Sequence, residues 1–299
     1  MTSQSIERLA ATLVAGKLAP YLGPELLLLE AANAWLPVRP ETLAERLAKR
    51  SAVPGRLRRN LTAAAQYIEN FRHRRVLRGL VREVFTDRAL PTRLHHLLAA
   101  LPLPLVVDVG YDAAMAAALA EHRDPSEWGQ VQAVSRADEK ADVWTQHYAA
   151  GGERVDPRAG RGWRTLLYKP FGSILPEANF LVSDSDFVEV LTEIDIQTPI
   201  PENVQLRRSS LGFLFVGCRF DNQLARTYAR QVSKRSSGPH FAVMQGELTA
   251  NEARFLAEQG IQRIDMATAD FVLQLGAAIE KALIAGAKRN QEAVAPVAM

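Results

Sequence analysis

Four short segments of the chain combine glycine with residues that could bind a ligand or transfer a proton. They are residues 22–25, 106–112, 166–173 and 217–222. Each segment contains or directly follows a short apolar run that is typical of a buried strand. Open α/β sheets place their ligands where strands enter such turns. The spacing therefore predicts a ligand crevice at one edge of a sheet, built from these four turns.

The elements that position these turns follow from the hydrophobic pattern. Apolar runs predict strands at residues 18–22, 105–107, 165–169, 211–216, 241–244 and 261–264. Helical spacing is found between most of them, and strands that alternate with helices imply a parallel sheet with right-handed crossovers. We therefore expect an α/β fold with a Rossmann-like parallel sheet flanked by helices.

Two regions interrupt this alternation. Residues 41–100 show almost only helical spacing, divided by prolines, which predicts a helical insertion between the first two strands. Residues 123–164 show little periodicity and include Gly151, Gly152, Gly160 and Gly162, which predicts an irregular excursion. The Rossmann-like domain would then comprise residues 1–40 and 101–290, followed by a frayed tail at 291–299.

The composition narrows the class of protein. Apolar residues make up 47% and charged residues 23%, as in ordinary globular proteins, and apolar runs stay well below the roughly 20 residues of a membrane helix. The first residues lack the order of a secretory signal, so we expect a cytoplasmic protein. One cysteine and six scattered histidines favour neither a disulfide nor a structural zinc module, and we predict no metal site.

The positive charge is concentrated in one region. Residues 49–93 hold twelve basic and three acidic residues, which suits an acidic partner, an anionic ligand or nucleic acid. Aromatic residues that would stack on bases do not accompany them, so a solvated helical face is favoured over a nucleic-acid site. The alternative nucleic-acid surface would consist of Arg56, Arg58, Arg59, Arg72, Arg74, Arg75 and Arg78.

The order of the four turns, with a helical insertion between the first two, resembles the sirtuin-like domain family. The similarity covers about residues 6–264 and is greatest to the bacterial branch that lacks the zinc module and includes NAD-cleaving defence proteins. It implies a crevice for NAD or a related nucleotide. By this resemblance the cofactor-binding positions would be Gly23, Tyr111, Asp112, Gly172, Gly217, Arg219 and Asn222.

The chain departs from the family's first two motifs. In the Gly-Ala-Gly-x-Ser motif only Gly23 agrees, because Pro24 has no N–H to donate and Glu25 would repel a phosphate. In the Thr-Thr-Asn-Tyr-Asp motif Gly110 replaces the asparagine. Tyr111 and Asp112 are retained, but both also have a purely structural interpretation. Tyr111 would be a packing side chain, and Asp112 would be the N-cap of the next helix.

The other two motifs are also altered. In Lys-Leu-His-Gly the histidine that serves the family as general base is Phe171, although Gly172 is retained. A general base typically contributes about a hundredfold to ten-thousandfold in rate. In Gly-x-Ser-x-x-Asp, Gly217 is retained, Asn222 replaces the aspartate, and Arg219 replaces the serine. The alternatives for Arg219 are binding of an anion, pairing with Asp221 or Glu25, and an ordinary surface salt bridge.

Other reactive side chains do not replace the lost ones. His95 and His96 lie in an apolar helical pattern, where at least one is expected to be structural. Cys218 follows a strand without an identifiable partner histidine, and His240 begins a strand. We therefore predict no catalytic residue.

The loss of the phosphate loop, the asparagine and the histidine in one crevice predicts a sirtuin-like pseudoenzyme that acts as a partner-binding or regulatory protein. Weak binding of NAD or a related nucleotide stays open. We expect a protein partner, without a nucleic-acid or membrane partner. Whether it forms a homo-oligomer stays open. The alternative is an NAD glycohydrolase or NAD-dependent deacylase with a rearranged site, which the retained Tyr111, Asp112, Gly172 and Gly217 support. A crevice plugged by Phe171 and Glu25 would favour the pseudoenzyme.

Overall fold

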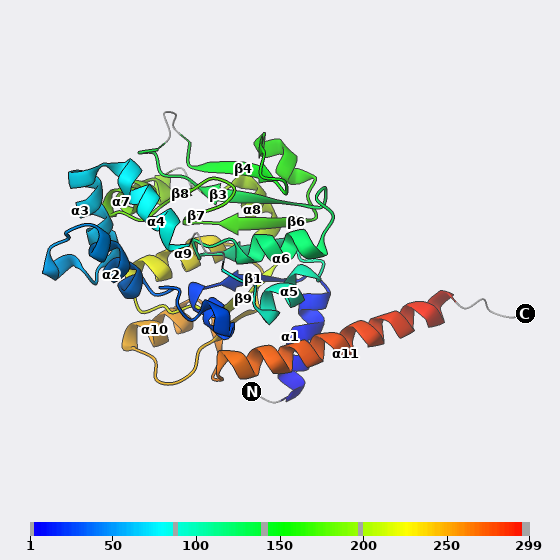
Figure 1. Ribbon diagram of the computed structural model, residues 1–299. Coiled ribbons are helices and arrows are strands. Elements are labelled where there is room, and N and C mark those ends of the chain that lie inside the picture. Colours follow the sequence, from blue (N-terminus) through cyan, green and yellow to red (C-terminus); the bar gives the residue numbers. More distant parts are fainter. Residues whose placement is uncertain (1–2, 86–88, 139–142, 197–199, 295–299) are drawn as a thin grey trace, which may run out of the picture.

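The fold is built on a nine-stranded, mostly parallel sheet (Figure 1). The computed structural model describes residues 3–85, 89–138, 143–196 and 200–294. The strand order is β11-β10-β9-β1-β2-β6-β3-β4-β5, and only β4 and β5 run antiparallel to their neighbours. The strands are β1 (Leu18–Leu22), β2 (Leu105–Asp108), β3 (Trp128–Ala133), β4 (Thr145–Ala149), β5 (Arg154–Val155), β6 (Thr165–Lys169), β9 (Gly212–Val216), β10 (His240–Val243) and β11 (Ile261–Ile264). The predicted α/β, Rossmann-like fold is confirmed.

Helices cover both faces of the sheet because its strands alternate apolar side chains between the two faces. In β1, Leu18 and Leu22 pack into one core, whereas Ala19 and Tyr21 pack into the other. The first core is covered by α1 (Ser3–Val14), α5 (Arg93–Ala99), α6 (Ala114–His122) and α11 (Thr268–Val294). The second core is covered by α8 (Glu202–Arg208), α9 (Gln223–Ser233) and α10 (Ala250–Glu258).

The region predicted as a helical insertion is helical. It contains α2 (Pro40–Arg50), α3 (Leu61–Arg72) and α4 (Arg74–Val84), which lie together beyond the carboxyl ends of the strands (Figure 1). These helices share a third core with Tyr111 and Phe180. The next helix, α5, instead contributes Leu94 and Leu98 to the core on the sheet.

The expectation of an irregular excursion at residues 123–164 is wrong. The segment forms β3, β4 and β5, and β3 is a buried strand between β6 and β4. Two buried glutamines interrupt its apolar pattern, and each has a hydrogen-bond partner. The Nε2 of Gln130 donates to the Leu175 carbonyl at 2.7 Å, and that of Gln132 to the Glu177 carbonyl at 2.9 Å. Because these hydrogen bonds offset the cost of burying amides, a polar sequence can form an inner strand.

The end of the chain is more helical than expected. The sequence predicts a frayed tail from residue 291, but helix α11 runs to Val294, and residues 295–299 lie outside the described ranges. It packs along α1 and then extends away from the sheet (Figure 1). Within the described ranges, a helix long and apolar enough to cross a membrane is not found.

Arg74, the first residue of α4, joins the helical region to the sheet domain. Its guanidinium lies 2.8 Å from Asp186 on α7 (Asp184–Ile196), 3.0 Å from Asp138 and 3.5 Å from Glu69. Burial lowers the pKa of Arg74, but the two aspartates outweigh this effect and raise it overall. Arg74 therefore does not belong to the alternative arginine surface, because it is a buried structural cation.

Candidate functional site

The edge of the sheet at which the sequence predicts a crevice is the place where the strand order changes direction. After β1 the chain adds β2 on one side, and later adds β9, β10 and β11 on the other. In open α/β sheets this switch point, at the carboxyl ends of the strands, is the usual ligand site. The turns after β1, β2, β6 and β9 all lie at that edge, so the structure brings the sequence-predicted segments together (Figure 1).

Gly23 and Gly217 meet at the switch point. The Gly23 amide donates to the Val216 carbonyl at 2.8 Å, and a Cβ added to Gly23 would lie 2.1 Å from the Gly217 carbonyl oxygen. Gly217 has a φ of +69°, and a Cβ there would lie 2.7 Å from the Leu26 amide nitrogen. Both positions therefore need glycine for the close approach of two backbones. The Gly23 amide, which would face a phosphate in the family's manner, is used within the fold.

Glu25 does not plug the crevice together with Phe171. It lies in a short 3₁₀ helix, Pro24–Leu29, and its carboxylate pairs with Arg39 at 2.7 Å near the surface. The plugged arrangement that would favour the pseudoenzyme is therefore not found in full, because Arg39 holds Glu25.

A buried ion pair lies below the second turn. Lys169, at the end of β6, places its Nζ 2.8 Å from Asp108 Oδ2 and 2.9 Å from the Asp112 carbonyl oxygen. The Gly110 amide donates to Asp108 Oδ1 at 2.9 Å. Burial raises the pKa of Asp108 to about 6, while Lys169 opposes this shift. Sequence reasoning did not identify this pair, although a charged residue at the end of each of two neighbouring parallel strands was the available signal.

Tyr111 and Asp112 have structural partners. Asp112 precedes the N-cap residue Ala113, and its Oδ1 accepts from the Ala114 amide at 2.8 Å, at the start of α6. The Tyr111 hydroxyl donates to the Leu181 carbonyl at 2.9 Å, and burial raises the pKa of Tyr111. A Cβ on Gly110 would lie 2.4 Å from Asp112 Oδ2, so the asparagine of the family motif does not fit beside this rotamer.

Phe171, at the position where the motif resemblance leads us to expect a histidine, belongs to an aromatic cluster. Its ring meets those of Tyr228 and Phe187 edge-on, with centroids 4.6 and 5.6 Å away. Next to it, Gly172 has a φ of +84°, and a Cβ there would lie 2.0 Å from the Asn179 carbonyl oxygen. Gly172 is therefore required by the pairing of β7 (Gly172–Ser173) with β8 (Asn179–Phe180).

The space beside this cluster is small. A cavity lined by Tyr168, Pro170, Tyr228 and five further residues has a volume of about 10 Å³. That volume is close to the minimum for one water molecule, whereas small-molecule sites typically measure about 300–1,000 Å³. In this conformation the cavity does not accommodate a nicotinamide ring.

Arg219 and Asn222 stabilise the ends of helices. The Arg219 guanidinium makes two hydrogen bonds to Glu252, at 2.9 and 3.0 Å, so the expected pairing with Asp221 or Glu25 is wrong. Glu252 is the buried third residue of α10 and forms a capping box with Thr249. Asn222 Oδ1 accepts from the Ala225 amide at 2.8 Å and caps α9. The Thr-x-x-Glu pattern was the sequence signal for the buried carboxylate that Arg219 meets.

The other reactive side chains also have structural contacts. His95 Nδ1 accepts from the Thr92 amide at 3.0 Å, and burial lowers the pKa of His95 to about 4, so the ring is neutral at pH 7. Burial raises the pKa of Cys218, whose thiol faces the Tyr21 carbonyl at 3.5 Å. His240 begins β10, as expected, and its Nδ1 accepts from the Phe213 amide at 3.2 Å.

Strand order, switch point and glycine turns together define a Rossmann-like α/β domain whose turns meet at the carboxyl ends of the strands. Residues 104–264, more than half of the chain, match the SIR2-like domain family. The chain belongs to this family. The matched region begins just before β2, so Gly23 lies outside it. A comparison with curated proteins gives no match to this chain.

Proposed function

We propose that this chain is a SIR2-like pseudoenzyme that binds a protein partner and does not turn over NAD. One observation supports the proposal most strongly: the groups retained at the crevice are used to hold the fold. The Gly23 amide bonds to β9, Asp112 to the start of α6, and Tyr111 to the Leu181 carbonyl. Phe171, in place of the histidine, has no atom that accepts a proton from a ribose hydroxyl.

The proposal predicts that nicotinamide release from NAD stays at the level of a protein-free blank. The purified chain, at high concentration, would be incubated with NAD and the products separated by chromatography. Tyr111→Phe serves as the diagnostic variant because it removes the hydroxyl that bonds to Leu181 and keeps the ring. Release that rises with protein concentration and is lost in Tyr111→Phe would establish the alternative, an NAD-cleaving enzyme with a rearranged site.

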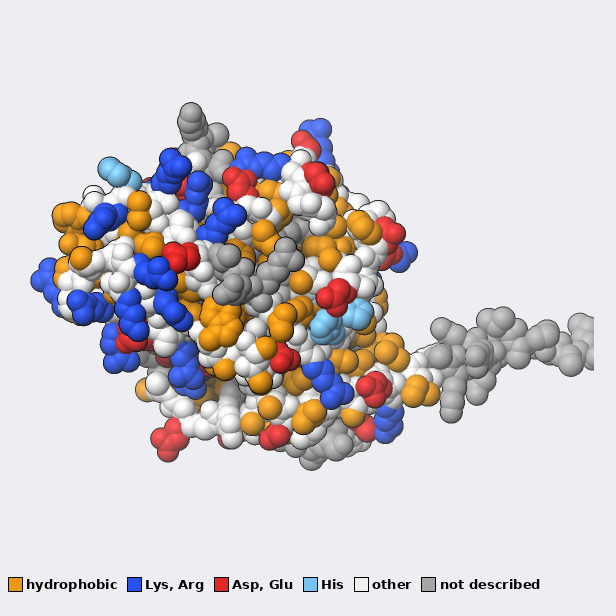
Figure 2. Space-filling model, in the orientation of Figure 1, with side chains coloured by type: hydrophobic (Ala, Val, Ile, Leu, Met, Phe, Trp, Pro, Cys, Tyr) orange, Lys and Arg blue, Asp and Glu red, His pale blue; other side chains and the backbone are white. Residues whose placement is uncertain are grey.

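A groove beside α4 is the surface that we propose for the partner. It is lined by Arg75, Arg78 and Arg82 of α4 and by residues 174–178, and has a volume of about 450 Å³. Figure 2 shows basic side chains gathered over the helical region to which α4 belongs. Tyr148 and Arg154 hold the carboxylate of Glu177, the acidic residue of the groove. Leu175 adds an exposed apolar wall. This chemistry suits an acidic peptide segment that carries an apolar residue.

Within this proposal, residues 1–40 and 101–290 form the sirtuin-like domain and the helices between them provide the binding surface.

We expect a fluorescent peptide rich in Glu and Leu to bind the full chain, with an affinity that falls as salt is added. Arg75→Glu should weaken binding by about fivefold or more, because reversing a charge adds repulsion to the lost attraction. Arg56→Glu, which changes an exposed arginine outside the groove, is the matched control.

Fluorescence anisotropy measures both affinities, and a single-stranded oligonucleotide of equal charge serves as competitor. Equal losses in Arg75→Glu and Arg56→Glu would contradict the assignment of the groove. Tighter binding of the oligonucleotide than of the peptide would instead favour the nucleic-acid surface.

A further inference from the structure

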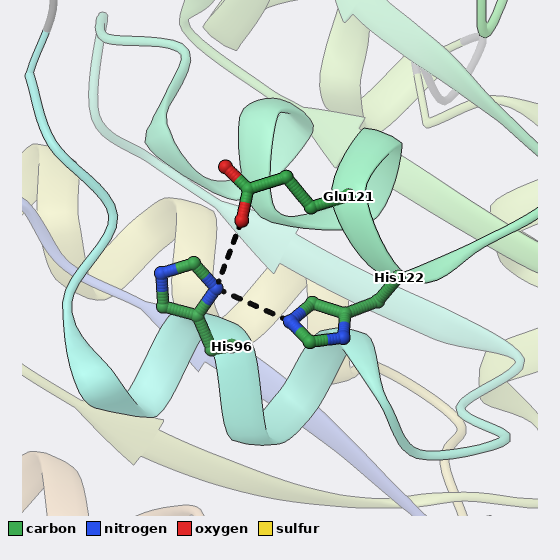
Figure 3. A group of neighbouring side chains, drawn as sticks. All are labelled: His96, Glu121 and His122. Atoms are coloured by element: carbon green, nitrogen blue, oxygen red, sulfur yellow. Dashed lines mark hydrogen bonds and ion pairs between the residues drawn. The ribbon is translucent and has the colours of Figure 1, made fainter.

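Two histidines and a glutamate lie together at the surface where α5 and α6 pack against each other (Figure 3). His96 Nδ1 lies 3.2 Å from His122 Nε2 and 3.4 Å from Glu121 Oε2. Their three ligand atoms all lie within 4.8 Å of one another. In Figure 3 the carboxylate and the His122 ring both point toward the same nitrogen of His96.

These separations match a metal coordination shell. With zinc–nitrogen and zinc–oxygen bonds of about 2.0–2.1 Å, neighbouring ligand atoms of a tetrahedral site lie about 3.3 Å apart. The two measured separations from His96 Nδ1 are within about 0.1 Å of this value. The remaining pair, Glu121 and His122, needs only a side-chain adjustment, since the Glu121 side chain is 59% exposed.

The surroundings favour a cation and hold the ligands in place. His122 is the last residue of α6, where the negative end of the helix dipole and the terminal carbonyl groups attract positive charge. The next residue, Arg123, turns its guanidinium to the carbonyls of Ala99 and Leu101 at the end of α5. This contact fixes the ends of the two helices relative to each other, so the ligands come from a rigid pair of elements.

We propose that His96, Glu121 and His122 bind one divalent transition-metal ion of the zinc type, with a fourth position open to solvent. Two imidazoles and one carboxylate select zinc over magnesium or calcium, which prefer oxygen ligands. Helix α6 begins beside Asp112 at the crevice and ends at His122, so the ion would lie away from the crevice and tie α5 to α6. The sequence does not reveal this site, because His96 and His122 are 26 positions apart and do not form a recognisable ligand spacing.

The test uses the untagged full chain, freed of metal with EDTA and titrated with zinc chloride by calorimetry. We expect one zinc ion per chain, and affinities at least about tenfold weaker in His96→Ala and in His122→Ala, since each removes one ligand. Glu121→Gln should weaken binding as well, and magnesium chloride should give no comparable heat. Zinc should raise the melting temperature of the natural chain and leave that of the double histidine variant unchanged.

His73→Gly is the matched control, because it removes an exposed histidine elsewhere and glycine accepts the φ of 70° at this position. It should bind zinc like the natural chain. Diffraction at the zinc absorption edge should place the ion between the three side chains. A stoichiometry well below one, or unchanged affinity in the double histidine variant with native circular dichroism, would overturn the proposal.

Discussion

Replacing Arg74 with methionine is expected to lower the free energy of unfolding by about 3–5 kcal/mol. The guanidinium lies within 3.0 Å of both Asp138 and Asp186, whose side chains are 9% and 3% exposed. Methionine keeps much of the length and the apolar stem but leaves these two carboxylates without their shared cation. An uncompensated buried charge costs more than the ion pair contributes, so the loss exceeds that of an ordinary surface substitution.

Urea unfolding followed by tryptophan fluorescence measures this loss. Arg75→Met is the matched control, because Arg75 lies on the same helix and its side chain is exposed. A change of less than about 0.5 kcal/mol is expected for Arg75→Met. Equal losses in the two variants would show that Arg74 does not join the helical region to the sheet domain in solution.

Replacing Lys169 with methionine is expected to cost a similar amount, about 3–5 kcal/mol at neutral pH. Lys169 is 1% exposed and is the cation that faces Asp108 beneath the crevice. The double variant Asp108→Asn, Lys169→Met should recover most of the loss, because both charges are then absent. The amide introduced by Asp108→Asn keeps an oxygen that accepts from the Gly110 N–H, as the carboxylate does in the natural chain.

The cost of Lys169→Met should also shrink as the pH falls from about 7 to about 4. Burial raises the pKa of Asp108 and Lys169 opposes this rise, so removing Lys169 raises the folded pKa of Asp108 further. The folded variant therefore binds this proton more tightly than the folded natural chain does, and acidification stabilises the variant more. Urea unfolding across this range measures the effect, with Lys17→Met, which changes an exposed lysine, as control. If the loss of free energy of unfolding in Lys169→Met stays constant with pH, then an uncompensated Asp108 is not its cause.

The parts of the fold that could be predicted from sequence are those in which local pattern and final burial agree. The strands expected at residues 18–22, 165–169 and 261–264 have the same bounds in the structure. In each of these strands the apolar residues of the pattern are buried. Strand β3 could not be found in this way, because Gln130 and Gln132 are buried through hydrogen bonds to a distant loop.

The candidate site could also be predicted only in part. The sequence predicted that the four turns lie at one edge of the sheet, and the structure places them there, because this depends on the order of strands and turns. It did not identify the partners of the charged residues. Arg219 meets Glu252, which is 33 positions away, and Arg74 meets Asp186, which is 112 positions away. Such pairs depend on how helices pack in three dimensions, and residue spacing does not encode that.

The close contact between Gly23 and Gly217 limits what these two glycines reveal about function in related sequences. Both residues are glycine because β1 and β9 run so close together that neither turn has room for a side chain. This requirement is the same whether or not the protein performs chemistry. Glycine at these two positions therefore indicates the fold and not catalysis. To distinguish active enzymes from inactive relatives, a comparison of sequences has to use the polar positions, above all the one that Phe171 occupies in this chain.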